Sequence, residues 1–268
     1  MVVNGKEVRL DAAMLVSRCR NILRLTIPAT LKFAGRILLV MDNEDVWTRD
    51  IVSELVEAYP GRVVVVKSGF PVANDLQELE DHGLYRRFRV IQGEVRDRVF
   101  QEIRGWAEKP EVLLFIDSDE YPHPISFPFL MDRFLSSGKG GVMMRSVTPI
   151  GDRFHAMKDG MAHHLRLMLW RDDLTALPYR QFTQYHPLEA DDLMRDDYSL
   201  VHNCYLTAEK RAFRGSSWSK AGFTDDTPVW SFNKSVDETS ATEIKKELFR
   251  GPDTTAGKLL AEVERYIN

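Results

Sequence analysis

Apolar and polar residues alternate in blocks along the first half of the chain, and these blocks predict strands separated by helices. Four short apolar runs have the length of buried strands: 13–17, 36–42, 62–67 and 112–116. Three intervening segments repeat apolar residues at helical spacing: 21–33, 48–59 and 95–106. Alternation of this kind predicts an α/β fold with a mostly parallel sheet flanked by helices.

Local signals refine this prediction. The consecutive valines of 63–66 predict a strand buried on both faces, as in a parallel sheet. Thr48 is expected to cap the helix that follows it, and Pro28 to break or restart the helix of 21–33. Residues 68–90 have the composition of a polar loop or irregular segment.

The second half of the chain is patterned more weakly. Residues 140–147 and 165–170 predict strands. Residues 171–200 are rich in Asp, Pro and aromatic side chains, and they predict loops and short helices over one end of the sheet. Two further helices are expected near 241–249 and 255–267.

Composition narrows the class of protein. The 268 residues are 28% charged with a net charge of −4, so bulk charge gives no indication of nucleic-acid binding. No apolar run approaches about 20 residues, and the N-terminus lacks the apolar core of a signal peptide. Two cysteines, Cys19 and Cys204, make neither a disulfide framework nor a structural zinc site. These features predict a cytoplasmic protein.

The candidate chemistry lies directly after the run 112–116, where three carboxylates follow: Asp117, Asp119 and Glu120. Because Tyr121-Pro122 blocks the strand from continuing, the acids are expected at its carboxyl end, where open α/β sheets bind ligands. Clustered carboxylates repel one another unless a divalent cation or another positive group neutralises them, and oxygen ligands suit Mg²⁺, Mn²⁺ or Ca²⁺. The alternative interpretation is a solvated acidic turn.

The order of these parts resembles the GT-A fold glycosyltransferases, especially their family 2-like branch. Leu114-Phe-Ile-Asp-Ser-Asp-Glu-Tyr121 is similar to the Asp-x-Asp motif of that family, and the earlier strand likewise ends in Asp42-Asn43-Glu44. The resemblance covers residues 11–125 and continues faintly to about 215. Two features depart from the family: Leu15–Asn21 replaces the usual Pro-x-Tyr-Asn loop, and no sharp Glu-Asp catalytic-base signature follows residue 150.

The resemblance implies a metal-dependent glycosyltransferase that moves a sugar from a nucleotide-sugar, by default a UDP-sugar, to a hydroxyl acceptor. It implies one continuous domain, with a Rossmann-like nucleotide-sugar-binding half at 1–125 and an acceptor-binding half with C-terminal helices at 126–268. The implied acceptor is a glycan or glycolipid. A hydroxymethylated base of viral DNA is an alternative, since residues 203–223 interleave basic and aromatic side chains.

The same resemblance implies roles for individual residues. Asp119 would ligate Mn²⁺ or Mg²⁺ directly, and Asp117 would bind the metal through water or hold the ribose hydroxyls. His202 would be a further metal ligand, with a buried core histidine as the alternative. Asp42 would bind the nucleoside, or else cap the following helix. Glu120 would be a weaker ligand or would orient another side chain.

Basic residues would meet the donor phosphates. Arg96 would approach the diphosphate, or else pair with neighbouring acids of its helix. Lys210 and Arg214 would close over the diphosphate, or else form a solvated face. On the strand at 165–170, alternation places His164 and Arg166 on one face, where they would line the acceptor cleft.

An inverting transfer also needs a general base near the acceptor hydroxyl. Asp192 is the preferred candidate and Asp191 the next, because they lie between the acidic motif and His202. A retaining transfer would need no such base. Competing classes are a haloacid-dehalogenase-like phosphatase, which also places Asp-x-Asp after an apolar strand, a nucleotidyltransferase, and a non-catalytic nucleotide-sugar-binding module.

Overall fold

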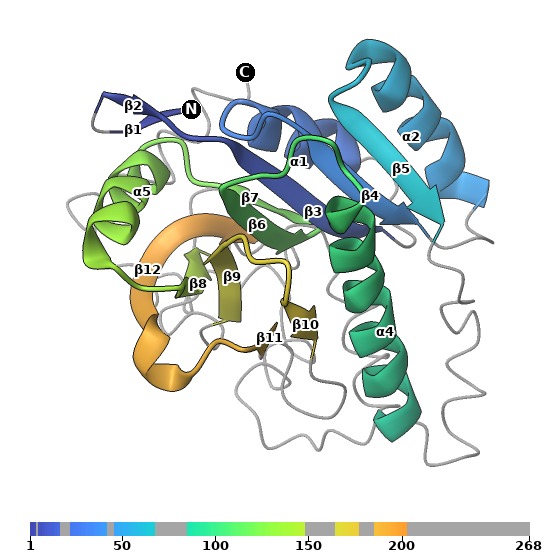
Figure 1. Cartoon of the computed structure of the whole chain (residues 1–268). Coiled ribbons are helices and arrows are strands. Elements are labelled where there is room, and N and C mark those ends of the chain that lie inside the picture. Colours follow the sequence, from blue (N-terminus) through green and yellow to red (C-terminus); the bar gives the residue numbers. More distant parts are fainter. Residues whose placement is uncertain are drawn as a thin grey trace, which may run out of the picture.

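The computed structural model describes most of the chain up to residue 202. The described segments are 1–3, 5–16, 22–41, 46–67, 85–147, 164–176 and 185–202. They form an eight-stranded sheet with helices against it, and two short antiparallel pairs (Figure 1). The short pairs are β1 (Val2–Val3) with β2 (Lys6–Glu7), and β10 (Thr175–Ala176) with β11 (Tyr185–His186).

The large sheet has the strand order β5-β4-β3-β6-β9-β8-β12-β7. Its strands are β3 (Leu10–Val16), β4 (Ile37–Met41), β5 (Val63–Lys67), β6 (Val112–Asp117), β7 (Glu120–Pro122), β8 (Gly141–Val147), β9 (His164–Leu169) and β12 (Leu193–His202). The neighbours β5, β4, β3 and β6 are parallel, as are β8 and β12, while β9 is antiparallel to both of its neighbours. The carboxyl ends of all six co-directed strands therefore point to one edge, which confirms the predicted mostly parallel α/β sheet.

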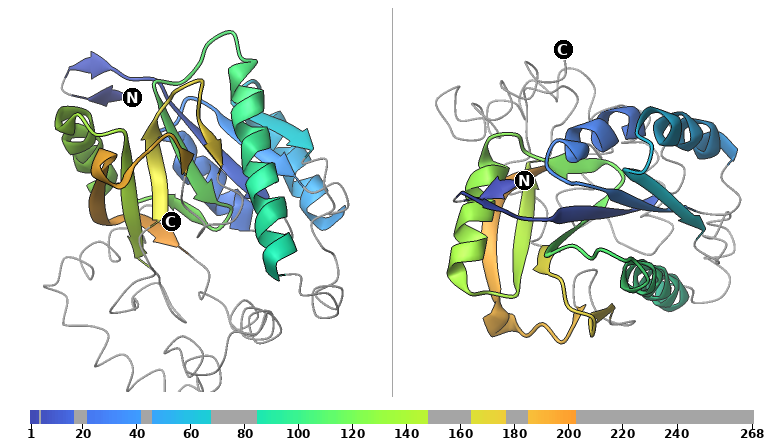
Figure 2. Two further views of the ribbon diagram at one scale, coloured as in Figure 1. Left: turned by 60° about the horizontal axis from the view of Figure 1, so that its bottom comes forward. Right: turned by 45° about the horizontal axis from the view of Figure 1, so that its top comes forward.

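Helices cover both faces of the sheet (Figure 2). One face carries α1 (Leu23–Leu31), α2 (Val46–Ala58) and α5 (Ser126–Ser137), and the other carries α4 (Tyr85–Arg104). Strand β6 shows the consequence, because Leu114 packs toward α1 and α2 while Leu113 and Phe115 pack toward α4. With both faces buried, the central strands need apolar side chains in both directions, which explains their unbroken apolar runs.

The four predicted strands of the first half are all present, but burial of one was predicted wrongly. Strand β5 is the edge of the sheet, so the side chains of 64–66 are only half-buried. The prediction for the start of β12 was also wrong, because residues 193–199 were predicted as loop and are part of the strand. The backbone of this part pairs with β8, and of its described polar side chains Arg195 is exposed while Asp196 and Ser199 are buried.

Helix boundaries differ from the prediction in three places. Thr48 lies inside α2, which begins at Val46, so it is not the cap. Helix α4 begins at Tyr85, so part of the predicted polar loop is helical. Pro28 is accommodated inside α1 without ending it. The helices expected near 241–249 and 255–267 lie outside the described residues.

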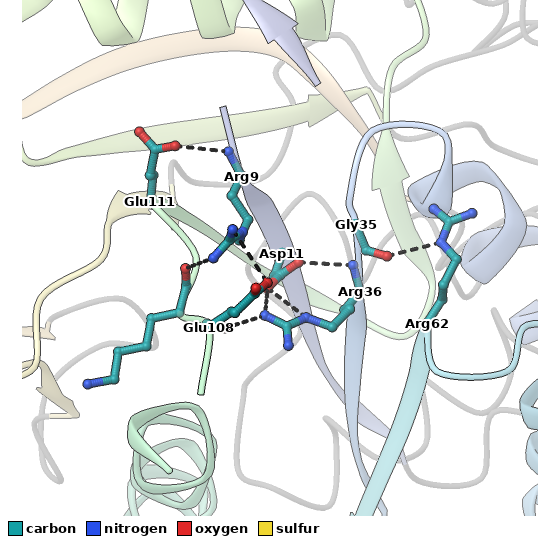
Figure 3. Close-up of polar contacts among 8 residues, drawn as sticks. Arg9, Asp11, Gly35, Arg36, Arg62, Glu108 and Glu111 are labelled. Atoms are coloured by element: carbon teal, nitrogen blue, oxygen red, sulfur yellow. Dashed lines mark hydrogen bonds and ion pairs between the residues drawn. The ribbon is translucent and has the colours of Figure 1, made fainter. Parts of the chain in front are cut away.

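A buried ion pair fixes the amino ends of β3 and β4 (Figure 3). The Asp11 carboxylate accepts hydrogen bonds from the backbone N–H, Nε and Nη2 of Arg36, the last at 2.7 Å. Arg36 also stacks its guanidinium 4.1 Å from the centre of the Trp106 ring. Gly35 leaves room for this, because a Cβ there would lie 3.1 Å from Asp11 Oδ1. Beside it, Arg62 donates to the Gly35 carbonyl.

We predict that Asp11→Asn lowers the free energy of unfolding by about 2–3 kcal/mol, because it leaves the buried end of Arg36 without its counter-charge. The value lies at the low end for buried pairs, since the Arg36 side chain is 26% exposed. The measurement is urea unfolding with an unchanged slope.

The matched control for this prediction is Glu54→Gln, which breaks the exposed Arg24–Glu54 pair. Its cost should stay below about 1 kcal/mol. Equal costs for the two variants would contradict a stabilising role for the buried pair.

Candidate functional site

The acidic turn, residues 117–120 between β6 and β7, lies next to His202 because the sheet curls back on itself. Strand β7 begins only three residues after the end of β6, yet it pairs with β12 at the far end of the strand order. Strand β12 is a long arc in Figure 1, and its register shifts between Asp197 and Leu200. Such a bulge bends a strand, and here the bend returns the end of β12 to β7, where His202 lies opposite Glu120.

Neighbouring elements hold this arrangement in place. The Thr26 hydroxyl of α1 donates to the Ser118 carbonyl at 2.9 Å, which ties the turn between β6 and β7 to the helix. At the β12 bulge, the Asp196 carboxylate accepts the backbone N–H of Ser199 at 3.2 Å and lies 3.3 Å from Arg133. The turn is therefore a fixed structural element rather than a solvated loop.

Arg166 of β9 supplies a positive charge between two of the acids. Its Nη2 donates to Asp117 Oδ2 at 2.6 Å and to Glu120 Oε1 at 2.9 Å, and its side chain is only 6% exposed. The second oxygen of Glu120 accepts the backbone N–H of Asp117 at 2.9 Å. Both oxygens of Glu120 are therefore engaged within the protein.

A second bulge aims this arginine at the acids. Strand β9 pairs Leu165 with Met143 and Leu167 with Val142, so Arg166 is an extra residue between consecutive partners of β8. The predicted alternation fails at this point, and Arg166 contacts the acidic turn. Sequence reasoning missed this contact, although an arginine between two leucines of an apolar strand was a signal that a buried acid lay nearby.

The electrostatics of the cluster follow from this geometry. Burial raises the pKa of Asp117, but Arg166 outweighs it and holds that pKa at about 2. For Glu120 burial dominates, and its pKa is raised despite the same arginine. Burial lowers the pKa of Arg166, but Asp117 and Glu120 more than compensate, so it is raised. At neutral pH Asp117 is thus an anion, paired with a permanent cation.

Asp119 and His202 form the second half of the cluster. His202 Nε2 lies 3.3 Å from Asp119 Oδ1, and its Nδ1 lies 3.8 Å from Glu120 Oε1. Within the described ranges, no group of three or more His, Cys, Asp or Glu side chains is arranged to hold a metal. Two protein ligands nevertheless suit Mg²⁺ or Mn²⁺ when the bound substrate supplies phosphate oxygens and water completes the shell. Asp119 and His202 fit that kind of site.

Arg96 of α4 reaches the same region from the opposite layer. It is buried, with its guanidinium 5.9 Å from the centre of the Phe115 ring of β6. Its charge helps to lower the pKa of Asp117, although less than Arg166 does. The structure therefore brings together six residues that sequence analysis had singled out: Arg96, Asp117, Asp119, Glu120, Arg166 and His202.

Other predicted site residues are not part of this cluster. Asp191 and Asp192 are exposed, in a short 3₁₀ turn at the amino end of β12, where Asp192 accepts the backbone N–H of Gly140. The ten residues of β12, about 30 Å of strand, separate them from the acidic turn. Asp42, Lys210 and Arg214 lie outside the described residues.

The similar solved structures given below have TM-scores under 0.5, which are too low to carry an argument about this chain. No family model matches the sequence, and no curated protein matches it. S. aureus TarS 1–349 superposes with a TM-score of 0.44 and 10% identity, covering 90% of this chain and 70% of that one. The same fragment in complex with UDP-GlcNAc gives 0.45 and 12%, covering 90% and 71%. Identities and TM-scores this low assign no activity, so the functional argument rests on the site. None of the described helices is long and apolar enough to cross a membrane.

His164, at the first position of β9, gives a test of these electrostatics. Burial and then the nearby Arg166 lower its pKa from 6.5 to about 4. We predict a neutral imidazole down to about pH 5, so the folded protein loses stability relative to the unfolded chain as pH falls from 6.5 to 4. An NMR titration of the ring, assigned with His164→Gln, should give a midpoint near 4. The urea-unfolded chain should titrate near about 6.5, and a folded midpoint there would refute the burial argument.

Proposed function

We propose that this protein is a glycosyltransferase that takes a sugar from a nucleotide-sugar donor and transfers it to a hydroxyl acceptor. The observation that carries the proposal is the position of the acidic turn. Asp117 ends β6 beside β3, where the strand order β5-β4-β3-β6 reverses direction, and such switch points bind nucleotides in open α/β sheets. The positive charge of Arg96, buried at the same place, favours an anionic ligand.

The roles of the side chains follow from their surroundings. Asp119 and His202 would hold Mn²⁺ or Mg²⁺, which supplies a Lewis acid against the charge of the leaving diphosphate. Asp117 is ionised and its side chain is 38% exposed, so it can accept hydrogen bonds from ribose hydroxyls while it stays paired with Arg166. Arg96 would face the phosphates from α4. Asp42, Lys210 and Arg214 keep their proposed contacts with nucleoside and diphosphate.

For acceptor binding we propose only which half of the chain is involved, not individual residues. Residues 1–125 would bind the nucleotide-sugar, and residues 126–268 would present the acceptor, a glycan or glycolipid with a hydroxyl group. Asp191 and Asp192 are not assigned as general bases, because a base must lie within hydrogen-bond reach of the acceptor hydroxyl and these acids lie at the other end of β12.

The test is nucleotide release from a panel of UDP- and GDP-sugars with Mn²⁺. We expect release from one donor, lowered about 100-fold or more in Asp119→Asn, because loss of even an outer partner of a metal ligand costs 10–100-fold. Chelation should abolish release in the wild type.

Asp132→Asn is the control, since Asp132 is a half-buried acid of α5 rather than of the acidic turn. It should release nucleotide at the wild-type rate. Phosphate release from a generic phosphoester, with no nucleotide-sugar bound, would instead identify a phosphatase.

A further inference from the structure

We propose that the Tyr185 hydroxyl is a binding group for the diphosphate of the donor, to which it donates a hydrogen bond. The inference rests on the proposed function and deepens it, because it assigns one contact of the nucleotide to a residue outside the acidic turn. It starts from a buried side chain whose polar atom the packing of the protein does not explain.

Two phenylalanines fix the ring of Tyr185, the first residue of β11. Tyr185 is 2% exposed, and its ring centre lies 5.4 Å from that of Phe100, edge to face, and 6.0 Å from that of Phe115. A phenylalanine would make the same ring contacts, whereas a buried tyrosine hydroxyl usually has a hydrogen-bond partner. Among the described residues, none forms a hydrogen bond with this hydroxyl. The packing therefore explains the ring of Tyr185 but not its hydroxyl.

Helix α4 fixes the strand pair that carries this tyrosine. Ala176 of β10 is the pairing partner of Tyr185, and its backbone N–H donates to the Asp97 carboxylate of α4. One turn and a half further along the helix, Arg104 donates to two backbone carbonyls of the segment that precedes β10. The position of Tyr185 is therefore set by the same helix that carries Arg96.

Tyr185 lies on the face of the sheet from which Asp117 is reached. Phe115 and Asp117 are two residues apart in β6, so both side chains point to the face that α4 covers. The guanidinium of Arg96 lies 5.9 Å from the centre of the Phe115 ring, so Arg96 and Tyr185 both lie against the ring that precedes Asp117. Burial raises the pKa of the Tyr185 hydroxyl, although Arg96 and Arg166 oppose this shift. The phenol is therefore protonated at neutral pH and lies within the field of these charges.

A protonated hydroxyl in the field of a buried arginine suits an anionic oxygen. The O–H donates a hydrogen bond while the guanidinium of Arg96 supplies the opposite charge, and hydrogen bonds to charged groups are the stronger ones. The Asp117 carboxylate, in contrast, accepts hydrogen bonds and so suits the ribose hydroxyls. Tyr185 and Asp117 would thus contact neighbouring parts of one nucleotide, the diphosphate and the ribose.

The experiment compares Tyr185→Phe with wild type in titrations that contain Mn²⁺. UDP and GDP are the probes for calorimetry, and the one that wild type binds more tightly is compared with its nucleoside, measured by NMR titration. In Tyr185→Phe the dissociation constant of the diphosphate should rise about 10-fold, because a hydrogen bond to a charged oxygen is lost. The dissociation constant of the nucleoside and the free energy of unfolding should not change, because the ring contacts remain.

Tyr59→Phe is the matched control, because Tyr59 is a half-buried tyrosine that packs on the opposite face of the sheet. It removes the same atom from the protein. Both dissociation constants should stay at their wild-type values.

An unchanged dissociation constant of the diphosphate in Tyr185→Phe would overturn the inference. An equal loss for diphosphate and nucleoside would also overturn it, because the hydroxyl would then contact the nucleoside. A lower free energy of unfolding, or a failure to fold, would assign the hydroxyl to the stability of the protein instead. Failure of the proposed function looks different, because wild type would then bind neither UDP nor GDP and turn over no nucleotide-sugar, and the inference would fall with it.

Discussion

Charge balance at the carboxyl edge of the sheet is the constraint on which this site depends. Burying several carboxylates beside one another is costly, because each disfavours ionisation of the next. Arg166 meets the constraint for Asp117 and Glu120, and His202 lies against Asp119.

The two ends of the sheet use the same chemistry for different purposes. At the amino ends, Asp11 receives three hydrogen bonds from Arg36 and is 1% exposed, so the pair has nothing to offer a ligand. At the carboxyl ends, a single nitrogen of Arg166 is shared between two acids, and the Asp117 side chain is 38% exposed. An ion pair that is saturated stabilises the fold, whereas one that is shared and partly open can take part in binding.

The sequence was sufficient for the elements whose patterning is local. The runs that became β3, β4 and β6 are apolar on both faces, and the acids lie at the carboxyl end of β6 as expected. It was insufficient where contacts between distant strands decide the outcome. The polar start of β12 reads as loop, and it becomes a strand only because β8 supplies its hydrogen-bond partners. The pairing of Arg166 with the acidic turn likewise depends on one extra residue in β9.

The bulges of β9 and β12 explain why the Asp-x-Asp motif alone does not define the site. If β9 alternated without a bulge, the face of the sheet on which Arg166 lies would follow from the neighbouring residues alone. A straight β12 would carry His202 away from the acidic turn. Each bulge re-aims one side chain, and together they bring an arginine and a histidine to acids that precede them by 46 and 83 residues (166 − 120 and 202 − 119). An Asp-x-Asp motif therefore marks the end of a strand, but the two bulged strands decide which side chains lie against its oxygens.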